Sequence, residues 1–325
     1  MSAQALLGVN DLRVSFDTRL GEVHAVNGVN FEVRQGEILG VVGESGCGKS
    51  ATLRAIVGLT QTPGRIDSGE VRFQDRDLLA MPPRELRRTR GRDIGFISQS
   101  PFGALNPILS IERQFANIIR AHRKESRKQC RAEALQALAS VGIAGPERVL
   151  EGYAHELSGG MAQRVVIAMA MIHNPLLLLA DEPTTALDVT VQRQILDLIT
   201  GLIKEDNRSM LLVTHDLSVV AQYCTRVMVM YAGKPVEIGS VREVFKNPKH
   251  PYTKALLDAV PKADGEIKGL SGSLPDLINY PVGCPYVSRC KFASDVCLER
   301  MPAMTEESGT RAVACHHQLV SAEVA

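Results

Sequence analysis

The chain has 325 residues, which allows one large domain or two modest ones with an ample core. Its 45% hydrophobic and 22% charged residues are typical of a globular protein, and its net charge of +1 gives no reason to expect nucleic acid or an anionic surface as partner. There is no apolar run of the ~18 residues that a membrane span needs, and the first residues show no signal-peptide pattern. We therefore expect the chain in the cytosol, docked on another protein if it works at a membrane.

The first 59 residues read as strands followed by a helix. Apolar residues alternate with polar ones up to Phe16, which is typical of a half-buried strand, and shorter strands are expected at 23–26 and 29–33. The continuous apolar run 38–42 indicates a strand buried on both faces. A glycine-rich loop follows, and then a helix at about 50–59.

Residues 60–173 change from short strands to helices. Strands are expected at 70–73 and 94–97, and the arginine-rich stretch between them reads as a solvated helix face rather than a nucleotide contact. From about 107 to 173 the pattern is helical. Within it, Ser126 and Gln129 form a capping box that begins one helix.

Strands and helices alternate again over residues 176–231, with buried strands expected at 176–179, 210–213 and 227–231. This alternation predicts an α/β fold with a largely parallel sheet. After about residue 240 prolines recur and cysteines gather, so we divide the chain into a nucleotide-binding domain, 1–240, and an appended domain, 241–325. Because no internal repeat is present, only one nucleotide domain is expected.

One motif carries specific chemistry: it fits G-x-x-x-x-G-K-S between an apolar strand and a helix. Its glycines let backbone N–H groups surround phosphate oxygens, and the helix that follows turns its positive end toward the same phosphates. Lys49 can reach the β- and γ-phosphates and Ser50 can bind Mg²⁺. The predicted phosphate-binding set is Gly43, Ser45, Gly46, Cys47, Gly48, Lys49, Ser50 and Ala51.

A second motif places two acidic residues at the end of an apolar strand, where ligands of open α/β sheets bind. Asp181 suits the Mg²⁺ shell, and Glu182 suits a carboxylate that polarises the attacking water. Together with the phosphate loop, these residues indicate a P-loop NTPase.

The segment Leu157–Met161, LSGGM, narrows that class, because here the sequence resembles the ATP-binding subunits of ABC transporters over nearly its whole length. The family usually has glutamine where this chain has Met161. The resemblance implies a P-loop ABC-type ATPase core with an N-terminal antiparallel β-subdomain, an inserted helical subdomain at about 107–173 and a cysteine-containing C-terminal extension. It also implies that Ser158, Gly159 and Gly160 face ATP bound to an opposing subunit, so that two chains enclose two ATP molecules.

Further pieces of the family pattern occur in the same order. Gln99 matches a glutamine that contacts Mg²⁺ and the attacking water, although serines flank it here. Asp188, in the segment 186–188, matches a loop that crosses the dimer interface. His215 matches the histidine that holds the γ-phosphate, and Phe16 is the best candidate for the aromatic residue stacked on adenine. Because Glu182 and His215 are both present, this half-site is expected to be catalytically competent.

The segment Lys246–Leu256 resembles the C-terminal extension of dipeptide and oligopeptide permease ATPases. This branch also serves nickel and oligosaccharide importers, so peptide is the favoured cargo among these. The resemblance implies a peripheral location on the cytoplasmic face of the inner or plasma membrane. It further implies two integral membrane permease subunits, a second and different ATPase subunit, an extracytoplasmic substrate-binding protein acting indirectly, and no nucleic acid.

The last four cysteines have the spacing C-x5-C-x6-C-x17-C, which differs from common zinc and ferredoxin spacings. The resemblance implies a [4Fe-4S] cluster on Cys284, Cys290, Cys297 and Cys315. Zinc, and free thiols or disulfides, remain alternatives, and His316 or His317 could replace one ligand.

Two other classes of protein fit the sequence less well than a transport ATPase does. Soluble ABC ATPases that act on DNA or ribosomes usually carry tandem nucleotide domains or long coiled-coil insertions, and this sequence has neither. An iron–sulfur redox protein with an accessory ATPase is disfavoured by the complete set of ATPase motifs.

Overall fold

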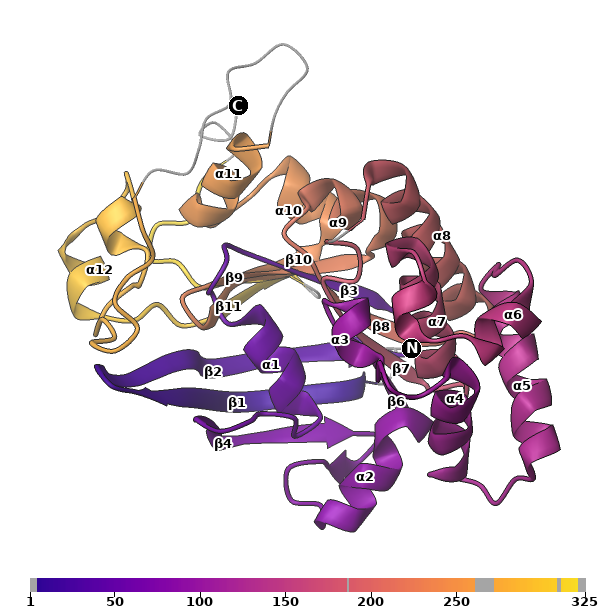
Figure 1. The fold of residues 1–325 in the computed structure, drawn as a ribbon. Helices are drawn as coiled ribbons and strands as arrows, with labels where there is room; N and C mark the ends of the chain where they lie inside the picture. The colour runs from indigo at the N-terminus through magenta and orange to yellow at the C-terminus, as the bar shows by residue number, and fades with distance from the viewer. Residues whose placement is uncertain (1–4, 186, 261–271, 309–310, 321–325) are drawn as a thin grey trace. The chain divides into compact units, whose positions relative to one another are not determined.

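The computed structural model describes residues 5–185, 187–260, 272–308 and 311–320. The chain divides into two compact units. Figure 1 labels their helices and strands. One unit is formed mainly by Ala80–Leu212, and the other combines Ala5–Val33 and Glu37–Leu79 with the residues described from Val213 onward. The domain boundary predicted near residue 240 stays a prediction.

The N-terminal strands of the second unit form an antiparallel sheet in the order β2-β1-β4-β5, whose first three strands lie side by side in Figure 1. Apolar residues alternate inward along β1, and in the pairing of β1 with β4 Leu7 lies opposite Phe73. The strands expected at 23–26 and 29–33 are one continuous strand, which passes through Gly28 at a positive φ of 79°. The bounds are β1 Ala5–Thr18, β2 Gly21–Arg34, β4 Gly64–Phe73 and β5 Arg76–Asp77.

The same unit has a mixed set of strands in the order β11-β12-β10-β9-β3. Strand β3, which leads into the phosphate loop, is buried at all five residues and runs parallel to β9, as its apolar run predicts. The strands are β3 Ile38–Val42, β9 Arg226–Tyr231, β10 Lys234–Ser240, β11 Thr305–Ser308 and β12 Arg311–Val313. The helices are α1 Lys49–Ile56, α9 Leu217–Tyr223, α10 Val241–Lys246, α11 Pro251–Asp258, the 3₁₀ turn η2 Val287–Arg289 and α12 Asp295–Glu299.

The first unit contains the strands β8-β7-β6, of which β6 and β7 are parallel, with Ile97 opposite Ala180. Helices α4, α5, α6 and α7 gather into one group (Figure 1). The capping box at α5 is confirmed, since Ser126 accepts the N–H of Gln129 and Gln129 Oε1 accepts the N–H of Ser126 at 3.0 Å. The arginine side chains of α2 lie mostly in solvent, as predicted.

The elements of this unit run from α2 to β8. They are α2 Pro83–Arg92, β6 Ile94–Ile97, α3 Pro101–Ala104, α4 Ile111–Arg120, α5 Arg127–Ser140, α6 Pro146–Glu151, η1 Ala154–Glu156, α7 Gly159–Met171, β7 Leu177–Asp181, α8 Val189–Glu205 and β8 Ser209–Val213. No helix in the described part of the chain is both long and apolar enough to span a membrane.

Candidate functional site

The phosphate loop lies between β3 and α1, as its motif predicts. All three of its glycines have positive φ angles, 154° at Gly43, 81° at Gly46 and 100° at Gly48. An added Cβ would lie 2.2 Å from the carbonyl oxygen of Met230 at Gly43 and 2.2 Å from that of Ala25 at Gly48. The loop therefore requires glycine for both its backbone conformation and its close packing.

Lys49 begins α1, and its side chain folds back over the loop. Its ammonium group donates to the carbonyl oxygens of Gly43 at 2.8 Å and Glu44 at 2.9 Å, and the residue is only 5% exposed. The thiol of Cys47 is 3.8 Å from this ammonium group. Burial raises the pKa of Cys47, although Lys49 opposes the shift, so the thiol stays protonated and leaves Lys49 as the cation of the loop.

His215 lies in the same unit, in the turn between β8 and α9. The N–H of Thr214 donates to the carbonyl oxygen of Val41 at 3.2 Å, which fixes this turn beside β3. Asp216 then caps α9 by accepting the N–H of Ser218 at 2.8 Å. The imidazole of His215 is thus presented from a turn that is anchored on both sides.

The acidic residues lie at the end of β7 in the other unit. Asp181 is 1% exposed and is the last residue of the strand. Glu182 follows with a φ of 46°, a left-handed conformation that is uncommon for a residue with a side chain. Its Oε2 accepts Gln99 Nε2 at 3.3 Å and the hydroxyl of Thr185 at 2.8 Å. Because β6 and β7 are parallel neighbours, the structure brings Gln99 and Glu182 together.

The segment Ser158–Gly160 begins α7. The Ser158 hydroxyl caps this helix by accepting the N–H of Met161 at 3.3 Å. A Cβ on Gly160 would lie 3.0 Å from Val191, so a larger residue would press on α8. Asp188 caps α8 by accepting the N–H of Val191 at 3.0 Å, while Ala186 of the same predicted loop lies outside the described residues.

Phe16 lies near the end of β1 and pairs with Gly64 of β4. A Cβ on Gly64 would lie 2.5 Å from the Phe16 ring, so the ring rests against the glycine backbone. The side chain is only half-buried, which leaves part of the ring open to solvent.

Two comparisons of the sequence bear directly on the family. The family described as "ABC transporter" matches residues 26–185, and "Oligopeptide/dipeptide transporter, C-terminal region" matches residues 236–297. The dipeptide transport ATP-binding protein DppD of Bacillus subtilis is 45% identical, covering 98% of this chain and 97% of its own length. The chain belongs to the ABC transporter family. The oligopeptide transport ATP-binding protein OppD of Salmonella typhimurium is also 45% identical, covering 96% of this chain and 94% of its own length.

Solved structures agree with this ABC transporter assignment. The ATP-binding cassette MJ0796, in a dimeric post-hydrolysis state bound to ADP and phosphate, superposes with a TM-score of 0.65 at 29% identity, covering 73% of this chain and 99% of that one. CbiO1 of Clostridium perfringens superposes with a TM-score of 0.61 at 28% identity, covering 74% and 90% respectively. The predicted ABC ATPase fold, mixed α/β with an antiparallel β-subdomain, is therefore confirmed.

The predicted iron–sulfur cluster is wrong. Cys284, Cys290, Cys297 and Cys315 line one hollow of about 10 Å³, but no group of three or more His, Cys, Asp or Glu side chains among the described residues could hold a metal ion. All seven cysteines are free thiols. Burial raises the pKa of Cys284 to about 11 and that of Cys315 to about 12, whereas clusters are bound by thiolates. The names of the relatives DppD and OppD refer to peptide transport and ATP binding, not to an iron–sulfur cluster.

Sequence reasoning missed three residues that contact the predicted site. Thr185 bonds to Glu182 within one turn, and a threonine three residues after a candidate catalytic acid could have signalled it. Tyr252 and Arg289 contact Glu44 of the phosphate loop from more than 200 residues away, and no local pattern indicates such contacts.

Proposed function

We propose that this chain is the ATP-hydrolysing subunit that energises import of dipeptides or oligopeptides through an ABC transporter. One observation carries the proposal: 45% identity to a dipeptide transport ATP-binding protein extends over 98% of the chain. The similarity includes both the nucleotide-binding region and the C-terminal region, so it extends beyond the ATPase core that all ABC proteins share.

The phosphate loop supplies the ATP-binding groups in this proposal. Backbone N–H groups from Gly43 to Ala51 surround the phosphates, and Lys49 exchanges its two carbonyl contacts for phosphate oxygens. Phe16 stacks on adenine through its solvent-facing ring, and His215 holds the γ-phosphate.

Ser50, Gln99 and Asp181 are assigned to Mg²⁺. Each offers an oxygen donor of the kind that this hard cation prefers. Because Asp181 is deeply buried, its carboxylate has little contact with bulk water. When bound, Mg²⁺ neutralises part of the charge on the phosphates.

Glu182 is the residue that positions and polarises the attacking water. Its contacts with Gln99 and Thr185 orient the carboxylate before ATP is bound. Ser158, Gly159, Gly160 and Asp188 act on ATP bound to an opposing subunit. The helix caps at the start of α7 and α8 support this assignment, because they fix the backbone N–H groups of both segments.

The partners follow from the same resemblance. We propose two integral membrane permease subunits, a second and different ATPase subunit, and an extracytoplasmic binding protein that delivers the cargo. The chain then works as a peripheral protein on the cytoplasmic face of the membrane. Helices α4 to α7 act as the inserted helical subdomain that passes motion to the permease, and residues 241–325 are the C-terminal extension.

The test uses the transporter assembled in proteoliposomes with its permease subunits. Glu182→Gln should retain ATP binding but lower ATP turnover by about 100-fold or more, because one positioned charge at the reacting group is lost. Uptake of a radiolabelled dipeptide or oligopeptide should fall with it. A matched control is Glu205→Gln, an exposed acid at the end of α8, which should behave as the wild type.

Near-normal turnover in Glu182→Gln would overturn the assignment of this residue. ATP-dependent uptake of nickel or an oligosaccharide, with no uptake of peptides, would keep the motor role and replace the cargo. Normal ATPase activity without any association with membrane subunits would favour a soluble ABC ATPase.

A further inference from the structure

Glu44 is the second residue of the phosphate loop, and each of its polar groups has a partner. Its N–H donates to the hydroxyl of Tyr252 at 3.0 Å, and its carbonyl oxygen accepts Lys49 Nζ at 2.9 Å and the N–H of Cys47 at 3.2 Å. Its two carboxylate oxygens accept Nη1 of Arg289 at 2.9 and 3.1 Å. Two of these partners, Tyr252 and Arg289, come from the C-terminal part of the chain.

Arg289 ends the 3₁₀ turn η2, and its side chain is 5% exposed. Besides Glu44 it donates to the hydroxyl of Tyr231 at 3.2 Å, and its guanidinium lies 5.7 and 5.8 Å from the ring centres of Tyr231 and Tyr286. The carboxylate of Glu44 is only 22% exposed. A charge pair with so little solvent around it is held strongly in one geometry. Removing one partner leaves the other charge buried without compensation.

Tyr252 is fully buried against two other tyrosines. Its ring centre lies 4.6 Å from that of Tyr231 and 5.3 Å from that of Tyr286. Burial strongly raises the pKa of its hydroxyl, which therefore stays neutral and accepts the Glu44 N–H through an oxygen lone pair. The backbone N–H of Tyr252 donates to Nδ1 of His250 at 3.0 Å, which fixes the start of α11.

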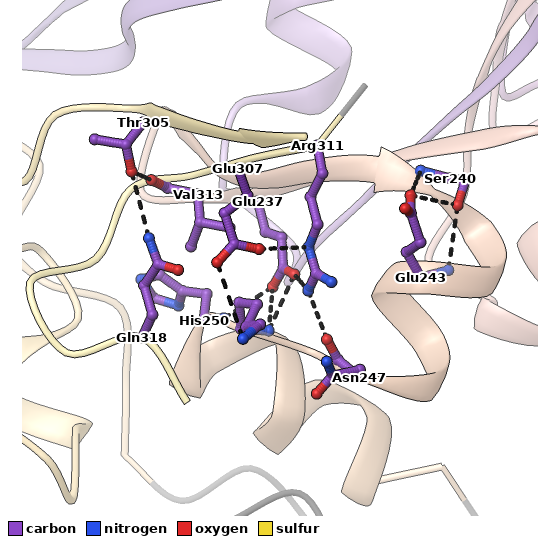
Figure 2. A network of polar contacts seen from close by, with 11 residues as sticks. Glu237, Ser240, Glu243, Asn247, His250, Thr305, Glu307, Arg311, Val313 and Gln318 are labelled. Carbon is purple, nitrogen blue, oxygen red and sulfur yellow. Dashed lines mark hydrogen bonds and ion pairs between the residues drawn. The ribbon is translucent and has the colours of Figure 1, made fainter. Parts of the chain in front are cut away.

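A buried polar network holds the start of α11 in place (Figure 2). The Glu237 carboxylate is 0% exposed and accepts the backbone N–H groups of Lys249 at 3.0 Å and His250 at 2.9 Å. It also pairs with Arg311 Nη2 at 2.5 Å, and Arg311 donates in turn to the carbonyl oxygen of Asn247. The segment that carries Tyr252 is thereby tied to β10 and β12.

We propose that Arg289 and Tyr252 are positioning residues for ATP binding. They hold Glu44 so that the N–H groups of the loop and Lys49 are arranged for the triphosphate before it arrives. This inference rests on the proposed function, since it assigns a role toward the same ATP. Both residues fall within the C-terminal region match at 236–297, so the extension acts on the nucleotide site itself.

The experiment measures binding of the non-hydrolysable analogue AMPPNP with Mg²⁺ to the full chain by isothermal titration calorimetry. Arg289→Met should weaken binding about tenfold, equivalent to about 1.4 kcal/mol, because the loop loses its fixed geometry. Arg300→Met removes an exposed arginine of the same region and should bind as the wild type does. Arg289→Lys, which keeps the charge, should recover part of the affinity, and Tyr252→Phe should weaken binding about threefold.

A double-mutant cycle separates positioning from general packing. Glu44→Gln should weaken binding by a factor similar to Arg289→Met, and the double variant should be about tenfold weaker, not about a hundredfold, because both changes remove one interaction. In the assembled transporter, Arg289→Met should raise KM for ATP while kcat changes less than about twofold.

Wild-type affinity in Arg289→Met and Tyr252→Phe would overturn this inference and leave the proposed function intact. Multiplicative losses in the double variant would also overturn it, because they would show that Arg289 does not act through Glu44. Absence of AMPPNP binding by the wild type would overturn both proposals together.

Discussion

The surroundings of Glu44 and Glu182 differ in how far along the chain their partners lie. Glu44 is held by Tyr252 and Arg289, which are 208 and 245 residues away. Glu182 bonds to Thr185 three residues on, and to Gln99 at the neighbouring strand end, both of which are exposed. The phosphate loop is thus held by distant, buried groups, whereas the carboxylate proposed to act in hydrolysis is oriented by exposed contacts near strand ends. The difference suits a loop that must be formed before ATP binds and a carboxylate that must adjust during turnover.

The largest effect is expected on stability, at the buried ion pair between Glu237 and Arg311. Arg311→Met leaves the carboxylate of Glu237 buried without its cation, which should lower the free energy of unfolding by about 3 kcal/mol or more. Arg242→Met, a change of the same kind on the exposed face of α10, should lower it by less than about 0.5 kcal/mol. Urea denaturation of the two variants measures both values. Equal stabilities would show that the buried network does not brace the C-terminal side.

Gly43→Ala tests whether the phosphate loop tolerates a side chain at position 43. The new Cβ would meet the Met230 carbonyl oxygen at a φ that favours glycine, so the free energy of unfolding should fall by about 2 kcal/mol and ATP affinity should fall with it. Gly201→Ala is the matched control, since nothing lies within 4 Å of a Cβ in this part of α8. That change should stabilise the protein by about 0.5–1 kcal/mol, because alanine favours helix. Thermal unfolding and AMPPNP binding distinguish the two.

Thr185→Val tests the exposed contacts that orient Glu182. Loss of one hydroxyl contact to Glu182 should lower kcat of the assembled transporter about fivefold and leave ATP affinity unchanged, because the contact orients the carboxylate that we propose acts in hydrolysis. A larger loss of affinity than of kcat would show that this region also braces nucleotide binding. Steady-state ATPase measurements over a range of ATP concentrations give both parameters.

The smallest effect concerns pH. Burial lowers the pKa of His250 to about 3, so the folded protein keeps this imidazole neutral while the unfolded chain binds a proton near the ordinary value of about 6.5. The stability from this group is present above pH 6.5 and is lost as pH falls toward 3, by at most about 1.4 kcal/mol per pH unit. His250→Asn keeps an acceptor for the Tyr252 N–H but does not titrate. Its stability should therefore fall less between pH 7 and pH 5.5 than that of the wild type.

Local patterns predicted the parts of the fold that depend on neighbouring residues. The apolar run 38–42 is a fully buried strand, and Ser126 with Gln129 caps a helix, because both features are decided within a few residues. The contacts of Glu44 with Arg289 and Tyr252 could not be predicted in this way, since they depend on how distant segments pack. The iron–sulfur prediction came from the resemblance and not from the cysteine spacing. It failed because a resemblance does not specify where the sulfur atoms of this chain point or whether they ionise.

The distance between Glu44 and Arg289 along the chain also has a consequence during synthesis. The phosphate loop leaves the ribosome early, but its guanidinium partner is made 245 residues later. At ordinary rates of translation this is a delay of about 10 to 50 seconds. During that interval the nascent chain carries the complete phosphate-loop motif without the side chain that holds it. Full affinity for ATP is therefore gained only after the C-terminal region has been made and has packed.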